Sequence, residues 1–397
     1  MPATKRSLIA VGTRPEAIKM APVIHALREQ RWADVRVLAT AQHRQMLDQV
    51  HEFFEVRPDR DLDVMREGQS LEELTARLIA AIGPALEEEQ PDLVLAQGDT
   101  TTVMVAALAC FYRKVPFAHV EAGLRTGDMS NPYPEEMNRV LVSRLSALHF
   151  APTQGAADNL HAEGIRAGVH ITGNTVIDAL LWTDQRVTTT PFPTSKGTKS
   201  VLVTAHRREN FGQPFATICA ALRELADRGD VRVVYPVHPN PKVRDEAYRA
   251  LGDHSAIHLM EPLGYPEMVA AMRACDLILT DSGGIQEEAP SLSKPVLVLR
   301  TTTERPEGVA AGSAKLVGTD RAAIVDAANE LLDNEAAYAA MAKVNNPYGD
   351  GRAVSLTGRA AASDESVGSV AEVDVAVEEA AGAPAHPHVP SHEHMLV

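Results

Sequence analysis

A strand, a loop and a helix follow one another near the start of the chain, in the stretch Leu8-Ile9-Ala10-Val11-Gly12-Thr13-Arg14-Pro15-Glu16. The apolar run at 8–11 has the length of a buried strand. Residues 16–29 repeat apolar side chains at three- and four-residue spacing, which is typical of an amphipathic helix. Pro15 suits the first helical position and Glu16 suits the first turn. The stretch therefore predicts the strand–loop–helix unit of an α/β protein.

The same unit recurs along the chain in two series. Further apolar runs of strand length occur at 35–39, 93–96, 116–120, 149–151, 170–172, 201–204, 231–235, 257–259, 277–280 and 296–299. Amphipathic helical stretches lie among them, at 71–89, 215–228, 267–274, 285–292 and 322–332. Alternation of strands with helices predicts parallel, doubly wound sheets.

The segment 186–199 interrupts the pattern, because it has three consecutive threonines, two prolines and no periodicity. We interpret it as a linker between two Rossmann-like lobes, 1–185 and 200–352. The fold class is therefore α/β, with both lobes facing a central cleft. Open α/β sheets bind ligands outside the carboxyl ends of their strands, so the cleft is the expected site.

Charge and cysteine content exclude several classes of protein. The 38 Lys and Arg against 53 Asp and Glu give a net charge of −15, whereas a nucleic-acid-binding protein would show a basic patch or stripe. Three scattered cysteines without CxxC spacing indicate reduced core thiols of a cytosolic protein. No segment has the pattern of a signal peptide or of a membrane helix. We expect a cytoplasmic protein with neither a nucleic-acid nor a membrane partner.

The segment 353–397 differs from the rest of the chain. From 360 onward it has seven carboxylates, no Lys or Arg and no aromatic residue. Such a segment cannot bury enough apolar surface to offset its ordering entropy, which predicts disorder. Its four histidines could bind a metal, but a solvated tail is favoured because no rigid scaffold fixes them.

Motifs for common cofactors are missing. Neither GxGxxG nor GxxxxGK[ST] occurs, which argues against a dinucleotide fold and a P-loop. Asp59-Arg60-Asp61 resembles the acidic pair with which some glycosyltransferases hold a metal, but a charged loop is the better interpretation. We therefore expect no metal and no cofactor.

Two segments could bind an anion at a helix start. Arg14 and Lys19 are cations near a helix N-terminus, where they oppose the helix dipole unless an anionic ligand is bound. The alternative is a capped helix in which Lys19 pairs with Glu16. In the second lobe, residues 282–284 form a Ser-Gly-Gly turn whose N–H groups could contact a diphosphate. Glu288 could then accept the ribose hydroxyls. The alternative there is only a tight turn.

Three carboxylates follow predicted strands or open a helix, namely Asp99, Glu121 and Glu135. Asp99 alone could be a helix cap, a role that Thr100 would serve equally well. Together, the three carboxylates in one cleft suggest proton transfer. His206 follows the first strand of the second lobe and could carry positive charge opposite a leaving phosphate.

Seven segments, in order, resemble the non-hydrolysing UDP-N-acetylglucosamine 2-epimerases. They are 12–22, 97–102, 119–127, 134–139, 204–212, 280–294 with 303–306, and 346–352. The resemblance implies a fold like that of the two-lobed GT-B glycosyltransferases. It also implies reversible epimerisation of UDP-GlcNAc to UDP-ManNAc for cell-envelope polysaccharides, and a homodimer.

The resemblance also assigns roles to residues. It matches Asp99, Glu121 and Glu135 to acid–base carboxylates and Arg139 to a supporting arginine. It matches a set of nucleotide ligands, which are Arg14, Lys19, His206, Ser282, Gly283, Gly284, Glu288 and Arg305. Of these, we count His206 with the catalytic groups. It further suggests a second, regulatory UDP-GlcNAc site, with Gln42, His43, Gln45, Gln69, Arg207 and His238.

The implied reaction is chemically reasonable. The C2–H of the sugar is not acidic until the C1–O bond to UDP begins to break and an oxocarbenium ion develops. A carboxylate can then remove the proton to give a glycal with a C1=C2 bond, and readdition of UDP with protonation on the other face inverts C2. A hydrolysing epimerase, a GT-B glycosyltransferase and a nucleotide-sugar sensor are the alternatives.

The resemblance weakens at its end. The family usually finishes with an amphipathic helix packed on the first lobe, whereas 353–362 is short, contains Gly358 and loses the apolar stripe. We therefore expect a weakened clasp between the lobes.

Overall fold

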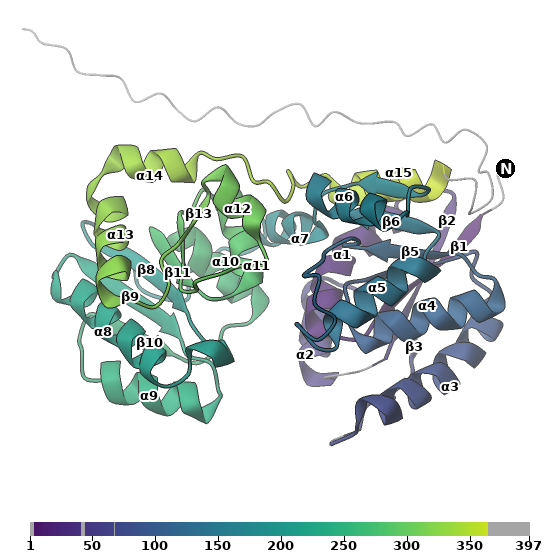
Figure 1. Cartoon of the computed structure of the whole chain (residues 1–397), viewed down its shortest axis with the longest axis horizontal. Helices are drawn as coiled ribbons and strands as arrows, with labels where there is room; N and C mark the ends of the chain where they lie inside the picture. The colour runs from purple at the N-terminus through teal and green to yellow at the C-terminus, as the bar shows by residue number, and fades with distance from the viewer. Residues whose placement is uncertain (1–3, 41–43, 67, 364–397) are drawn as a thin grey trace, which may run out of the picture.

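Two fully parallel β-sheets form the centres of two lobes (Figure 1). The computed structural model describes residues 4–40, 44–66 and 68–363, without the side chains of 44–48. The first sheet has the order β3-β2-β1-β4-β5-β6-β7. Its strands are β1 (Lys5–Val11), β2 (Ala33–Ala39), β3 (Arg60–Asp61), β4 (Leu93–Gln97), β5 (Phe117–Val120), β6 (Leu148–Ala151) and β7 (Val169–Ile171).

The second sheet repeats this plan with the order β10-β9-β8-β11-β12-β13. Its strands are β8 (Lys199–Thr204), β9 (Val231–Pro236), β10 (Ile257–Met260), β11 (Leu277–Thr280), β12 (Val296–Val298) and β13 (Ala314–Leu316). The expectation of two doubly wound α/β lobes is therefore confirmed. The strand order of each sheet reverses beside its first strand, β1 or β8, which is where such sheets bind ligands.

Helices cover both faces of each sheet. Alternate residues of β1 point to opposite faces, so Ile9 packs with α1 (Arg14–Arg28) and α7 (Thr175–Asp184), while Leu8 packs with α3 (Leu71–Glu89) and α4 (Thr101–Arg113). The remaining helices of the first lobe are α2 (Arg44–Phe53), α5 (Glu135–Leu145) and α6 (Gln154–Ala162). Those of the second are α8 (Gln213–Asp227), α9 (Pro241–Leu251), α10 (Tyr265–Ala274), α11 (Gly283–Glu288), α12 (Pro306–Ala311), α13 (Arg321–Asp333) and α14 (Glu335–Ala342).

One hydrophobic core runs through both lobes. It includes Ala179 and Leu180 of α7 and Val269 and Met272 of α10, together with strand residues of both sheets. Figure 1 shows α7 between the lobes. The linker expected at 186–199 lies between the end of α7 and the start of β8.

The expectation of a disordered tail from 353 onward is wrong for residues 353–363, which form the closing helix that the sequence was expected to weaken. Helix α15 (Ala353–Ser363) packs on the first lobe, and Figure 1 shows the chain crossing back from α14 to reach it. Its buried residues are small, since they are Ala353, Thr357, Ala360, Ala361 and Ala362. A Cβ added at Gly358 would meet Leu27 of α1 at 3.8 Å. The contact is made by small residues that allow a close approach, which an apolar-stripe argument overlooks.

The structure differs from the sequence-based expectations at two short strands. Arg60 and Asp61 form a two-residue edge strand beside β2 rather than a loop, and β13 was not predicted, because both strands are too short to show a period. Asp59 accepts the N–H of Val37 at 2.8 Å. Within the described residues, no group of three or more His, Cys, Asp or Glu could hold a metal ion. The acidic tail beyond 363 lies outside the described residues.

All three cysteines are free and buried, as expected of core thiols, and burial raises the pKa of each thiol to about 12. No helix in the described part of the chain is long and apolar enough to cross a membrane.

Candidate active site

The carboxyl ends of β1, β4 and β5 open into one cavity of about 460 Å³, because these three strands are neighbours in the first sheet. We call it the carboxylate cavity. It is lined by Thr13, Pro15, Glu16, Lys19, Gln97, Gly98, Asp99, Thr100, Glu121, Leu124, Glu135, Arg139 and Arg305. The structure thus brings together all three carboxylates that the sequence singled out, with three cations around them.

Glu121 is the most constrained of the three carboxylates. It follows β5 directly with a φ of +64°, a left-handed backbone that non-glycine residues seldom adopt and that is found at functional sites. Its carboxylate accepts hydrogen bonds from Gln97 and from Lys19 Nζ, the latter at 2.5 Å. Burial opposes its ionisation, but Lys19, Arg305 and Arg139 outweigh burial and hold the pKa of Glu121 below its ordinary value. Glu121 is therefore ionised at neutral pH.

Lys19 does not pair with Glu16, so that alternative is wrong. Glu16 instead accepts the backbone N–H groups of Gly12 at 2.5 Å and Thr13 at 3.0 Å, which completes a capping box with Thr13. The helix caps itself, and Lys19 is left to face Glu121 across the cavity.

Asp99 is held by α5 and not by the helix that follows it. Thr100 caps α4, with its hydroxyl accepting the N–H of Val103. The carboxylate of Asp99 therefore bonds Arg139 Nη2 at 2.5 Å, and its carbonyl accepts Asn138 Nδ2 at 2.8 Å. Arg139 thus contacts Asp99 directly, and the supporting role that the resemblance implies for it stays a prediction.

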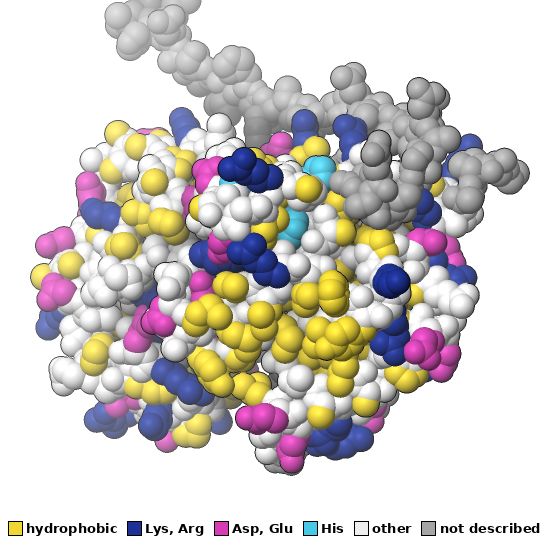
Figure 2. Space-filling view, turned by 45° about the vertical axis from the view of Figure 1, so that its right-hand side comes forward, with side chains coloured by type: hydrophobic (Ala, Val, Ile, Leu, Met, Phe, Trp, Pro, Cys, Tyr) yellow, Lys and Arg dark blue, Asp and Glu magenta, His cyan; other side chains and the backbone are white. Residues whose placement is uncertain are grey.

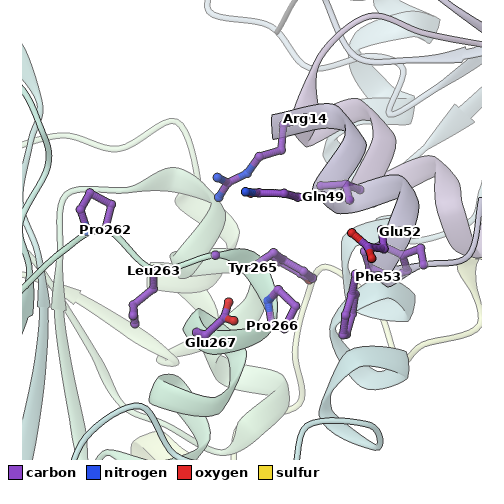
Figure 3. A pocket seen from close by; sticks show the side chains of 12 residues that line it. Arg14, Gln49, Glu52, Phe53, Pro262, Leu263, Tyr265, Pro266 and Glu267 are labelled. Atoms are coloured by element: carbon purple, nitrogen blue, oxygen red, sulfur yellow. The ribbon is translucent and has the colours of Figure 1, made fainter. Parts of the chain in front are cut away.

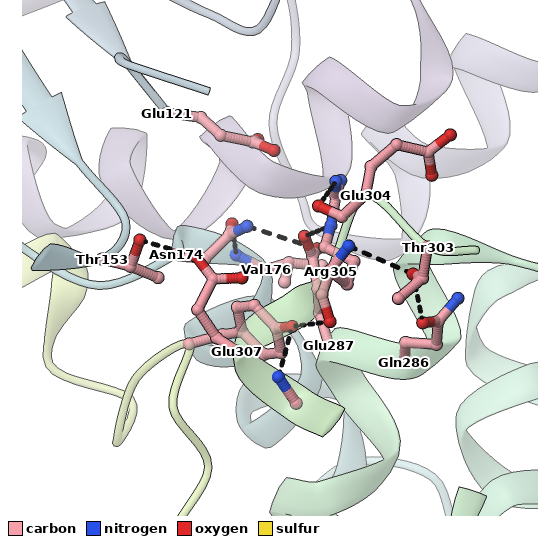
Figure 4. Close-up of polar contacts among 12 residues, drawn as sticks. Glu121, Thr153, Asn174, Val176, Gln286, Glu287, Thr303, Glu304, Arg305 and Glu307 are labelled. Carbon is pink, nitrogen blue, oxygen red and sulfur yellow. Dashed lines mark hydrogen bonds and ion pairs between the residues drawn. The ribbon is translucent and has the colours of Figure 1, made fainter. Parts of the chain in front are cut away.

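Arg305 reaches the carboxylate cavity from the second lobe. Its Nε donates to Glu287, a buried residue of α11, and Glu287 also accepts Asn174 Nδ2 from the first lobe at 3.3 Å. Figure 4 shows this network between the lobes. Nearby, Thr153 donates to Glu307 at 3.0 Å across the same boundary.

The other predicted nucleotide ligands gather where β8 and β11 end. A Cβ added at Gly284 would lie 3.6 Å from Glu288 Oε1 and 4.0 Å from Ser282 Oγ, and one at Gly283 would lie 3.9 Å from Arg305. The Ser-Gly-Gly turn therefore lies beside both Glu288 and Arg305. Burial raises the pKa of Glu288 to about 8, although the hydroxyl of Tyr265 donates to it at 3.1 Å and lowers it in part.

A second cavity, of about 630 Å³, separates α2 from the start of α10 (Figure 3). Arg14 and Gln49 lie on the wall from the first lobe, and the segment 262–267 forms the other wall. Tyr265 belongs to this wall, and its hydroxyl donates to Glu288, so Glu288 is one hydrogen bond away from the cavity that Arg14 lines. The sequence reasoning missed the 262–267 wall, which has no polar motif to mark it.

The residues proposed for a regulatory site are not assembled within the described residues. Gln42, His43 and the side chain of Gln45 lie outside them. Gln69 accepts the N–H of Arg66 at 3.2 Å, whereas His238 stacks on His206 with ring centroids 5.1 Å apart. Among the described residues, no hydrogen bond or ion pair joins Gln69 to His238 or to Arg207. The regulatory site stays a prediction.

Comparisons with known proteins agree with one another. A family model described as UDP-N-acetylglucosamine 2-epimerase matches residues 25–358. A UDP-N-acetylglucosamine 2-epimerase of Yersinia pestis is 52% identical over 360 residues, which cover 87% of this chain and 95% of the relative. The crystal structure of UDP-GlcNAc 2-epimerase from Neisseria meningitidis bound to UDP-GlcNAc is 46% identical, with a TM-score of 0.83 over 89% of this chain and 98% of that one. An Anabaena protein in complex with UDP and glucose, 16% identical with a TM-score of 0.58 over 90% of this chain and 98% of that one, shares the fold alone.

Proposed function

The chain belongs to the UDP-N-acetylglucosamine 2-epimerase family, and from this premise we infer that it interconverts UDP-GlcNAc and UDP-ManNAc without hydrolysis. One structural observation supports the proposed acid–base chemistry. Asp99, Glu121 and Glu135 line one cavity with Lys19, Arg139 and Arg305. Proton removal and return at one carbon needs carboxylates around a single small volume, and this cavity supplies them.

The carboxylate cavity takes the sugar. As the C1–O bond breaks, the bonding electrons go to the UDP oxygen and positive charge develops on the ring, where ionised carboxylates stabilise it. Glu121 is ionised because three cations oppose the effect of burial, so it can accept the C2 proton. A second carboxylate of the set returns a proton to the other face of the glycal, and readdition of UDP completes the inversion.

The nucleotide lies between the lobes beside the second cavity. The Ser282 turn, the cations Arg14, Lys19 and Arg305, and the imidazole of His206 receive the diphosphate, and Glu288 receives the ribose hydroxyls. The position of Glu288 next to the glycine turn and beside the cavity that Arg14 lines supports this placement. In this arrangement Arg305 stands between the leaving diphosphate and Glu121.

A time course by ¹H NMR with UDP-GlcNAc alone tests the assignment. We expect UDP-ManNAc to accumulate to a constant ratio with UDP-GlcNAc. Free ManNAc with UDP would identify a hydrolysing enzyme, and no change without an added acceptor would point to a glycosyltransferase. If the protein binds UDP-GlcNAc but forms no product with or without an acceptor, it is a nucleotide-sugar sensor.

The chain works as a homodimer in the cytoplasm. Figure 2 shows hydrophobic side chains gathered on one face. Among the exposed residues, Phe111 and Tyr112 at the end of α4 are 61% and 65% accessible, and Leu141 of α5 is also exposed. Exposed apolar surface of this kind marks interaction sites, and we propose that the adjacent aromatic side chains Phe111 and Tyr112 take part in the dimer contact. Light scattering should give twice the mass of one chain, and Phe111→Ser with Tyr112→Ser should shift it toward one.

A further inference from the structure

A buried carboxylate, that of Asp281, lies beside His206 and is not among the groups that act on the sugar or bind the nucleotide. Asp281 follows β11 and is completely buried, with 0% of its surface exposed. Its Oδ2 accepts the backbone N–H groups of His206 and Arg207, each at 2.8 Å, and Nδ2 of Asn210 at 3.1 Å. One oxygen of Asp281 therefore fixes the loop that follows β8.

The other oxygen of Asp281 is unused within the described residues. Oδ1 is buried and has no hydrogen-bond partner there. It lies 3.5 Å from Nδ1 of His206, just beyond a hydrogen bond with good geometry. An unpaired buried acceptor is costly, so a small rotation of the imidazole toward Oδ1 is favourable.

His206 is open on its other side. Its side chain is 36% exposed, and the ring of His238 stacks on it at an interplanar angle of 11°. Because Nδ1 faces Asp281, Nε2 is the nitrogen left for a ligand. The geometry matches a histidine whose proton is directed by a buried carboxylate.

We propose that Asp281 is a positioning residue for the epimerisation: it accepts Nδ1–H of His206 and thereby holds the imidazolium that donates Nε2–H to the diphosphate. The proposal rests on the proposed function, because it takes a nucleoside diphosphate as the ligand of His206. Asp281 itself touches neither the sugar nor the diphosphate in this account.

The charges around His206 give the proposal a pH dependence. Burial lowers the pKa of His206, Asp281 raises it, and His238 and Arg207 lower it, so that it lies below its ordinary value in the free protein. A bound diphosphate adds negative charge and favours the imidazolium. UDP should therefore bind with uptake of a proton, and Asp281 makes that uptake possible near neutral pH.

Asp281→Asn tests the proposal with little change in shape. The amide oxygen can take the place of Oδ2 and accept the same three N–H groups. The amide NH₂ then faces Nδ1, which must act as an acceptor, so His206 becomes a neutral Nε2–H tautomer. We expect the imidazole pKa, measured by NMR on ¹³C/¹⁵N-histidine-labelled protein, to fall by about one unit or more. UDP affinity at pH 7 should fall about tenfold for each unit, with kcat reduced as well.

Asn210→Ser is the matched control, because it removes one bond to Oδ2 and leaves Oδ1 facing the ring. It should leave the imidazole pKa of His206 near the wild-type value. A wild-type titration of His206 in Asp281→Asn would overturn the proposal, as would a lowered pKa with unchanged UDP affinity.

The wild-type protein provides a test that needs no variant. The ¹⁵N shifts of His206 at pH 8 should show the Nδ1–H tautomer without UDP and an imidazolium with saturating UDP. An Nε2–H tautomer in the free protein would contradict the proposal. These shifts do not depend on turnover, so they separate a failure of this proposal from a failure to form UDP-ManNAc.

Discussion

Three physical effects meet at Glu121. Its backbone has a positive φ, its side chain is buried, and its carboxylate faces Lys19 at 2.5 Å. Burial alone would favour the protonated form, but the neighbouring cations reverse that preference. The side chain is thus held in one place and in one charge state before substrate binds.

Replacing the carboxylates should separate chemistry from binding. Asp99→Asn, Glu121→Gln and Glu135→Gln keep the size of each side chain but remove the base, so each should lower kcat at least ~10²-fold. Because all three lie in the carboxylate cavity, calorimetry should show UDP affinity changed little. Near-normal kcat in all three variants would refute the catalytic assignment.

Glu288→Ala should show the opposite behaviour. Two charge-assisted bonds to the ribose are worth ~1.5–3 kcal/mol each, so UDP binding should weaken strongly. Calorimetry is best done at about pH 9, because burial raises the pKa of this carboxyl to about 8 and the charge-assisted bonds need the ionised form. Unchanged UDP affinity at that pH would place the ribose elsewhere.

Residues at strand ends could be predicted from the sequence, and residues that hold them could not. Glu121 directly follows one apolar run and Asp99 comes three residues after another, so the parallel-sheet rule brings them together. Glu287 and Asp281 also stand in the motif that drew attention to Ser282, but their partners Asn174 and His206 are 113 and 75 residues away. The hydrophobic pattern of the sequence does not reveal which distant polar residues form such pairs.

Among the elements, α15 shows how a helix of small residues can close a two-lobed chain. It begins against α7, where Asp178 accepts the N–H of Val354 at 3.2 Å. The helix therefore receives its N-terminal cap from another element. A sequence window that looks for large apolar side chains misses the contact, because Ala360 and Ala361 pack closely without them.

Two truncations separate α15 from the tail that follows it. Truncation after Ser363 should leave kcat and Tm nearly unchanged. Truncation after Arg352 also removes α15 and should lower Tm by more than ~5 °C, on the scale of 1–2 kcal/mol for a chain this size. Equal Tm values for the two would show that α15 contributes no stability.

Asp178 should make the stability of the protein depend on pH. Burial raises its pKa from 3.8 to about 6, and the N–H groups of Val354 and Ala353 lower it only in part. The folded state therefore binds this proton more tightly than the unfolded state. The resulting stability is present below about pH 4 and is lost as pH rises through about 6, by up to about 3 kcal/mol.

Asp178→Asn keeps an acceptor for the helix and cannot ionise. The difference in free energy of unfolding between wild type and variant should therefore fall between pH 4 and pH 7 in urea titrations. A constant difference across that range would contradict the role assigned to Asp178.

At the scale of the whole molecule, each lobe contributes one half of the proposed site. The first sheet presents the carboxylates and the second presents the Ser-Gly-Gly turn. Arg305 belongs to the second lobe but lines the carboxylate cavity of the first, and it is held there by Glu287, which also bonds Asn174 of the first lobe. Two α/β lobes and a cleft follow from the alternation of strands and helices along the sequence. The position of Arg305 in the cavity of the other lobe cannot be predicted from that alternation, because it depends on how the two lobes are oriented.

The predicted regulatory site belongs to this scale as well, since Gln69 and His238 come from different lobes. If the segment around Gln42 binds UDP-GlcNAc as a second ligand, the reverse reaction from pure UDP-ManNAc should be slow until trace UDP-GlcNAc is added. Gln69→Ala should lose this stimulation. Hyperbolic kinetics from pure UDP-ManNAc, with no stimulation, would show that no such site operates.

Solvent exchange at C2 tests the central claim most directly, because only proton removal and return by the enzyme links the carboxylate cavity to the reaction. UDP-GlcNAc is incubated with the protein in D₂O, and the product is examined by NMR and mass spectrometry. We expect UDP-ManNAc with one deuterium at C2. UDP-ManNAc that retains the original hydrogen at C2 would contradict the account and favour an internal transfer.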